Sequence, residues 1–191
     1  MTALLLGVLL LAPLAAGLAC RLLARPATRD AVHVAGCLVT SVAGLLLAGA
    51  VFAGYPIPEV GDVLLVDPLS AYMVALVVTV AGVAGLYAPA YLHHEVAQGG
   101  LGAGRLASFY LWFHLFVWTM LLLVVMNNLG LLWAAIEATT VVSAILVGFY
   151  QTRPVLEAAW KYLMLCSVGI IIALFGVLLT YYGRSEEHTS E

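Results

Sequence analysis

Residues 129–150 read Leu-Gly-Leu-Leu-Trp-Ala-Ala-Ile-Glu-Ala-Thr-Thr-Val-Val-Ser-Ala-Ile-Leu-Val-Gly-Phe-Tyr, an apolar run whose only charged side chain is Glu137. A helix needs roughly 20 such residues to cross the hydrocarbon core of a bilayer, which is about 30 Å thick. The run is continuously apolar and does not alternate as a barrel strand does. It therefore predicts a transmembrane helix.

The rest of the chain has the same character. Hydrophobic residues make up 64% of it and charged residues only 9%, against about 25% in a soluble domain. We predict an all-α integral membrane domain over residues 1–183, with helices near residues 2–20, 31–54, 68–90, 107–126, 129–150 and 156–182. The net charge of −3 comes with no basic patch, so nucleic acid is not an expected partner.

The positions of the arginines predict the orientation. The loops after the first, third and fifth expected helices hold the basic residues Arg21, Arg25, Arg29, Arg105 and Arg153. The loops at residues 55–67 and 127–128 hold no lysine or arginine. The positive-inside rule then places the N-terminus outside and the arginine loops in the cytoplasm. We expect a multi-pass protein of a bacterial inner (cytoplasmic) membrane.

The last eight residues do not follow this pattern. Residues 184–191 read Arg-Ser-Glu-Glu-His-Thr-Ser-Glu, which is abruptly polar and resembles the translation of a sequencing-library adaptor. We predict that this tail is not native, and that the natural protein continues beyond Gly183. The three cysteines, Cys20, Cys37 and Cys166, lie in or at the ends of spans without Cys-x-x-Cys spacing. We therefore read them as packing residues, with no metal site and no disulfide.

Glu137 is the first candidate functional residue. It lies about eight residues from the outer end of its helix, hence roughly 12 Å deep and close to the midplane. A carboxylate there costs about 2.5 kcal/mol or more unless it is paired, hydrated or protonated, and such residues usually mark ion or proton paths. The alternative is a protonated glutamate that is hydrogen-bonded to a neighbouring helix. Thr140, one turn further on, is a possible donor for such a bond.

Lys161 and His114 are the other two candidates. Lys161 lies roughly 7 Å from the cytoplasmic side, where its ammonium can snorkel or pair with Glu157 one turn earlier. His114 lies about 10 Å from that side, and a hydrogen-bonded packing role is the alternative for it. Taken together, Lys161, His114 and Glu137 are spaced titratable groups on three helices. Water-bridged groups of this kind form membrane proton relays, so the three residues predict a proton pathway.

The same residues carry a family resemblance. Residues 133–140, 148–150 and 156–162 resemble the matching helices of the F subunit of hydrogenase-4, a formate hydrogenlyase-type complex, and residues 91–97, 113–122 and 127–129 agree as well. The resemblance is weak before about residue 67. More distantly it extends to the antiporter-like subunits of respiratory complex I and to multisubunit sodium/proton antiporters.

This resemblance implies a fourteen-helix fold with two inverted five-helix repeats, of which this chain holds the first six helices. It implies a non-redox subunit with no catalytic centre and no cofactor of its own, which assembles with other membrane and peripheral subunits. Glu137 matches the family's helix-five glutamate and Lys161 its helix-six lysine. In the family the glutamate tunes a lysine that passes protons on through water when partner subunits perform redox chemistry.

Two other classes of function remain open. A subunit of a multisubunit cation/proton antiporter would carry the same glutamate and lysine. A purely structural membrane scaffold would tolerate neutral replacements of both residues.

Overall fold

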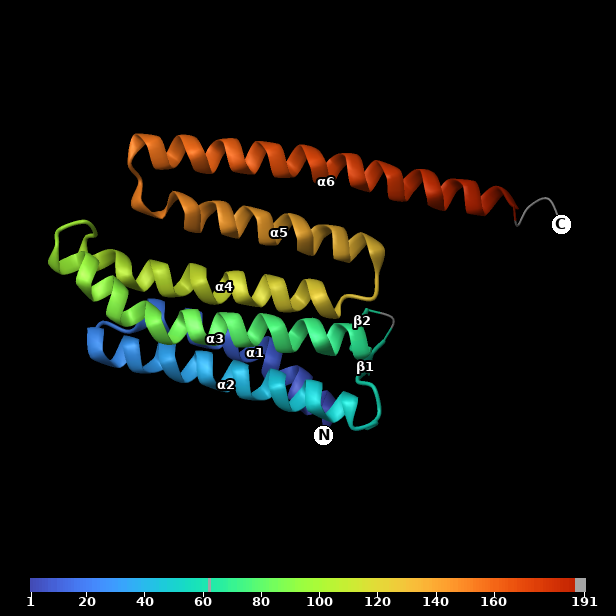
Figure 1. Ribbon diagram of the computed structural model, residues 1–191, viewed down its shortest axis with the longest axis horizontal. Helices are drawn as coiled ribbons and strands as arrows, with labels where there is room; N and C mark the ends of the chain where they lie inside the picture. Colours follow the sequence, from blue (N-terminus) through green and yellow to red (C-terminus); the bar gives the residue numbers. More distant parts are fainter. Residues whose placement is uncertain (62, 188–191) are drawn as a thin grey trace.

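The fold consists of six long helices, which a computed structural model describes for residues 1–61 and 63–187 (Figure 1). The helices are α1 (Thr2–Leu22), α2 (Pro26–Phe52), α3 (Pro68–Ala97), α4 (Leu106–Val125), α5 (Leu129–Val147) and α6 (Arg153–Glu187). Each is long and apolar enough to span a membrane. The predicted all-α membrane fold with six spans is confirmed.

The helix ends differ from the predicted spans by a few residues. Helix α2 begins at Pro26 instead of residue 31, because a proline at the first helical position has its φ preset and lacks only an N–H that needs no helical partner. Helix α3 continues through Pro89 to Ala97, and α6 begins at Arg153. Of the predicted non-native tail, residues 184–187 continue α6, and residues 188–191 lie outside the described residues.

Two helices begin at side chains that cap their first turn. The Asp67 carboxylate accepts a hydrogen bond of 2.7 Å from the Ser70 amide at the start of α3, and this bond lowers the pKa of Asp67. The Asn128 side chain accepts from the amides of Gly130 and Leu131 at 3.0 and 3.2 Å, where α5 begins. These caps satisfy amides that the first turn leaves without a helical partner.

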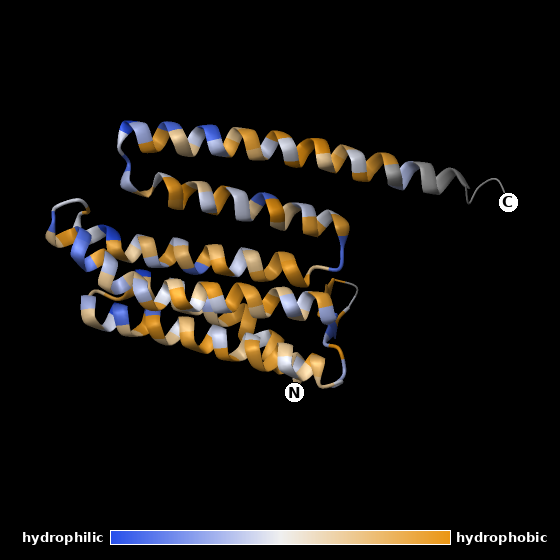
Figure 2. Ribbon diagram, in the orientation of Figure 1, coloured by the Kyte–Doolittle hydropathy of each residue, from blue (hydrophilic) through white to orange (hydrophobic). Residues whose placement is uncertain are grey.

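Helices α1 to α4 form a bundle around a buried apolar core, to which Leu9, Leu47, Val78 and Leu121 each contribute from a different helix. Helix α5 packs on α4, and α6 packs on α5 at the edge of the molecule (Figure 1). Apolar residues cover the middle of the helices, and polar residues gather near the loops (Figure 2). The most apolar stretch of α6 contains no buried residue, so its outer face is available to lipid or to another polypeptide.

The two ends of the bundle differ in charge. One end carries Arg21, Arg25, Arg29, Arg105 and Arg153, and we call it the arginine end. At the opposite end a short antiparallel pair, β1 (Glu59–Val60) and β2 (Leu64–Leu65), forms part of the loop between α2 and α3. The amide of Asn127 donates to the Val63 carbonyl at 2.8 Å, which joins this loop to the connection between α4 and α5.

Candidate functional site

Glu137 projects from the middle of α5 towards α6. Its Oε1 accepts a hydrogen bond of 2.7 Å from the Ser167 hydroxyl of α6. Its Oε2 is buried and has no hydrogen-bond partner among the described residues. Burial of a carboxylate oxygen without a hydrogen-bond partner costs free energy, and a proton, a water or a cation bound at this atom would offset that cost.

The same side chain also lines an open groove between α4 and α5. The groove has a volume of about 440 Å³, and its lining includes Leu115, Trp118 and Thr119 of α4 and Trp133 of α5. Glu137 thus lies where a polar interhelical contact meets an apolar groove.

Thr140, the possible donor to Glu137, does not make that bond. The Thr140 hydroxyl donates to the Ile136 carbonyl of its own helix at 3.1 Å, and Ser167 supplies the bond to Glu137 instead. A threonine inside a helix has this backbone acceptor within reach, whereas only the packing of α6 on α5 brings Ser167 to the carboxylate.

Two further polar contacts join α5 and α6 on either side of the Glu137–Ser167 bond. The hydroxyls of Ser143 and Tyr162 are hydrogen-bonded at 2.9 Å on the side nearer the arginine end. On the other side the Trp133 indole donates to the Ile170 carbonyl at 3.3 Å. We call these three contacts the α5–α6 seam.

Lys161 lies outside the seam, towards the arginine end. It is six residues before Ser167, hence about 9 Å away along the axis of α6. Its ammonium is within 2.5 Å of the Glu157 carboxylate, and both side chains are exposed. The i, i+4 pairing that the sequence suggested is present, and an exposed pair of this kind contributes little stability. The structure does not bring Lys161 into contact with Glu137.

His114 belongs to a different part of the bundle from Glu137. Its side chain packs against Gly17 of α1 and Gly36 of α2, on another face of α4 from the residues that line the groove. Its Nε2 lies 3.1 Å from Nδ1 of His33, and both rings are almost fully buried. The single relay through Lys161, His114 and Glu137 therefore separates into two polar systems. We call the second one the histidine pair.

The histidine pair has polar neighbours that the sequence did not single out. Nε2 of His33 lies 3.0 Å from the Gly85 carbonyl of α3, and the Tyr110 ring stacks on His33 with centroids 4.2 Å apart. The Tyr110 hydroxyl donates to Asp30 at 2.7 Å, and the other oxygen of Asp30 lies 2.7 Å from His93. A row of polar side chains thus runs from the arginine end to the centre of the bundle.

Three potential metal ligands meet at this pair. Donor atoms of His33, Cys37 and His114 lie within 4.8 Å of one another among the described residues. However, both ring nitrogens of His33 are already engaged, one with His114 and one with Gly85. The Cys37 Sγ atom lies 3.9 Å from Nε2 of His33. An ion could bind only by replacing these bonds, so the geometry is that of a hydrogen-bonded pair. All three cysteines are free thiols.

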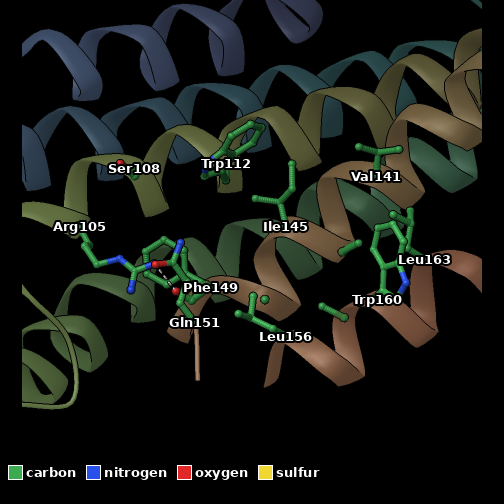
Figure 3. Close-up of a pocket in the computed structure, with 13 residues that line it drawn as sticks. Arg105, Ser108, Trp112, Val141, Ile145, Phe149, Gln151, Leu156, Trp160 and Leu163 are labelled. Carbon is green, nitrogen blue, oxygen red and sulfur yellow. Dashed lines mark hydrogen bonds between the residues drawn. The ribbon is translucent and has the colours of Figure 1, made fainter. Parts of the chain in front are cut away.

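A further cavity of about 490 Å³ lies between α4, α5 and α6 near the arginine end (Figure 3). Trp112 of α4, Ile145 of α5 and Trp160 of α6 line it. At its rim the Arg105 guanidinium donates to the Phe149 carbonyl at 2.6 Å and covers the Phe149 ring. These contacts fix the loop before α4 against the end of α5, next to the Lys161–Glu157 pair.

These features define a multi-pass membrane protein with a buried carboxylate between two helices, and the comparison with known proteins agrees. The chain is 32% identical over 149 residues to a hydrogenase-4 component F homolog of Methylacidiphilum infernorum. It is 37% identical over 119 residues to the chloroplastic NAD(P)H-quinone oxidoreductase subunit 5 of Zygnema circumcarinatum. It is 31% identical over 127 residues to NADH-quinone oxidoreductase subunit L of Neisseria meningitidis.

The chain therefore belongs to the complex I-like antiporter-type subunit family. The first of these matches covers 78% of this chain and 31% of the relative, so the chain spans about a third of that protein's length. The other two cover 62% and 61% of this chain and 16% and 18% of the relatives. No family model matches the chain.

Proposed function

We propose that the chain is a proton-translocating membrane subunit of a redox-driven assembly, of the hydrogenase-4 (formate hydrogenlyase) or complex I type. Glu137 and the α5–α6 seam take part in the proton path, and Lys161 is the cation nearest to it on α6. The chain itself performs no redox chemistry. Its partners are the other membrane and peripheral subunits of the assembly.

The observation that carries this proposal is the Oε2 atom of Glu137. It is buried at mid-helix without a hydrogen-bond partner, while Oε1 is held by Ser167. A carboxylate in the apolar part of a membrane protein usually marks an ion or proton path. The names of the relatives, which include hydrogenase and quinone oxidoreductase subunits, support coupling to redox chemistry.

The two ion-transport alternatives separate in vesicles that contain the assembly and a pH-sensitive dye inside. Hydrogen, formate and NADH are supplied in turn, and a sodium pulse is given in a separate run. We expect acidification that follows electron donation and needs no sodium. A sodium pulse that moves protons without any electron donor would establish the cation/proton antiporter alternative instead.

The orientation is a separate proposal, with the arginine end in the cytoplasm and the N-terminus outside. Val60 is half-exposed in the loop between α2 and α3, and Gly100 is exposed in the loop between α3 and α4. In a Cys166→Ala background, a membrane-impermeant maleimide added to whole cells should label Val60→Cys. It should label Gly100→Cys only after the cells are opened. Labelling in the reverse order would refute the orientation.

Ser167→Ala should weaken the proton path without unfolding the protein. It removes the only donor to Glu137 that the described residues supply, and a hydrogen bond to a charged group contributes about 1.5–3 kcal/mol. We expect proton translocation to fall roughly tenfold, and the infrared C=O band of protonated Glu137 to move to higher frequency. Thr79→Val is the matched control, because the exposed Thr79 hydroxyl donates at 2.7 Å to the Ala75 carbonyl of its own helix, away from the seam. If the two changes lowered proton translocation equally, the proposed role of Ser167 in the proton path would be refuted.

A further inference from the structure

The histidine pair has a defined arrangement of protons. A carbonyl oxygen only accepts, so Nε2 of His33 must carry the hydrogen that faces Gly85 at 3.0 Å. In a neutral ring Nδ1 of His33 is then an acceptor, and Nε2 of His114 must donate to it across 3.1 Å. The one ring nitrogen left with a free lone pair is Nδ1 of His114. The pair can therefore accept one proton there without losing a hydrogen bond.

Asp30 is the carboxylate placed to balance such a charge. It is bonded to the Tyr110 hydroxyl, and the Tyr110 ring stacks on His33 at an angle of 16° between planes. The other titratable or charged neighbours are Cys20 of α1, Arg29 and Cys37 of α2, and His93 of α3. The Arg29 guanidinium donates to the carbonyls of Cys20 and Leu23, and no ion pair joins it to Asp30 among the described residues.

A small cavity lies on the other side of the pair. It has a volume of about 10 Å³, which is room for about one water, and its lining includes His114, Thr40 and Ser41. Thr40 and Ser41 follow Cys37 along α2, so the cavity lies further from the arginine end than His33. Polar groups therefore adjoin the pair on both sides along the membrane normal.

We propose that the His33–His114 pair binds one shared proton, with Asp30 as its counter-charge through Tyr110. It is a proton-binding site separate from Glu137. A proton taken up at Nδ1 of His114 allows the Nε2 proton of that ring to move to Nδ1 of His33. His33 then holds the charge as an imidazolium next to Tyr110 and Asp30, and His114 is neutral in its other tautomer. The role of this site in transport rests on the proposed function, whereas proton binding does not.

The exposed end of the row gives protons access to this site. The His93 side chain is 48% exposed and Asp30 is 22% exposed, whereas Tyr110 and His33 are fully buried. No hydrogen bond joins Tyr110 to the pair among the described contacts, so that step requires a water or a rotation of the imidazole ring.

The test uses the full chain in lipid nanodiscs, with ¹⁵N-labelled histidine followed by NMR as the pH is lowered from about 8 to about 4. His33→Gln and His114→Gln assign the signals. We expect the two rings to change together and to take up one proton between them. Asp30→Asn should lower the proton affinity of the pair about tenfold, and Tyr110→Phe should lower it less because the ring stack is kept. Glu59→Gln, in the loop at the opposite end, should change nothing.

Two results would overturn this inference. One is a pair that stays neutral over the whole pH range, which would make it a packing contact. The other is an Asp30→Asn titration that matches that of Glu59→Gln, which would remove the counter-charge. The measurement needs no transport activity, so a failed Glu137 test with a normal titration of the pair would refute the proposed function alone.

Discussion

Proton translocation is expected to fall at least about tenfold when Glu137 is replaced by glutamine, while the assembly still forms. Glutamine preserves the volume and can still accept from Ser167, so α5 and α6 should pack as before. It removes the carboxylate of the α5–α6 seam. If Glu137 also tunes a lysine, loss of the negative charge lowers the pKa of that lysine. Proton uptake by vesicles, normalised to assembled protein, gives the measurement.

Glu137→Asp is the matched control for this prediction. It keeps the charge and moves it by one methylene, so part of the activity should remain. A structural scaffold predicts the opposite order, in which glutamine is harmless and aspartate is slightly worse because it leaves a packing gap. Full translocation by the glutamine variant would end the proposed role of Glu137.

The sequence predicted the six spans and the mid-helix position of Glu137 because both depend on properties along one helix. Length and composition determine whether a segment crosses a bilayer, and a rise of about 1.5 Å per residue places a side chain along it. The partner of Glu137 depends on how α6 is rotated about its own axis. Helix α6 is apolar on all sides, so no polar face indicates that Ser167 points to α5.

His33 was missed for a different reason. With the second span expected to begin at residue 31, His33 is placed next to a loop, where a polar side chain can reach water and does not indicate a functional site. Because Pro26 starts α2, His33 lies two turns inside the helix, roughly 10 Å from its beginning. Proline at a helix start was the signal that could have located it. The contact with His114 joins residues 81 apart in sequence, from α2 across the bundle to α4. It depends on how α1 and α3 pack against both of these helices.

The close approach of α1 and α2 that places the histidine pair depends on Gly36. A Cβ added at Gly36 would lie 2.4 Å from the Cβ of Ala16 on α1 and 3.2 Å from Cε1 of His114. The Ala16 Cβ is fixed to its backbone and cannot rotate away, so the two helices would have to separate. Membrane helices associate through small residues that allow such contacts, because burial from water does not drive them together.

Gly36→Ala should therefore lower the free energy of unfolding by about 1–3 kcal/mol, the usual cost of overpacking. Gly49→Ala on the same helix is the matched control, because a Cβ there meets nothing within 4 Å and alanine is the better helix former. Thermal unfolding in detergent should thus show a lower Tm for Gly36→Ala and an unchanged or higher Tm for Gly49→Ala. Gly85→Ala should fall between them, since its added Cβ meets the Cys37 thiol, which can rotate. If Gly36→Ala were as stable as Gly49→Ala, the two helices could not be packed as closely as the structure shows, and the His33–His114 contact would lose its support.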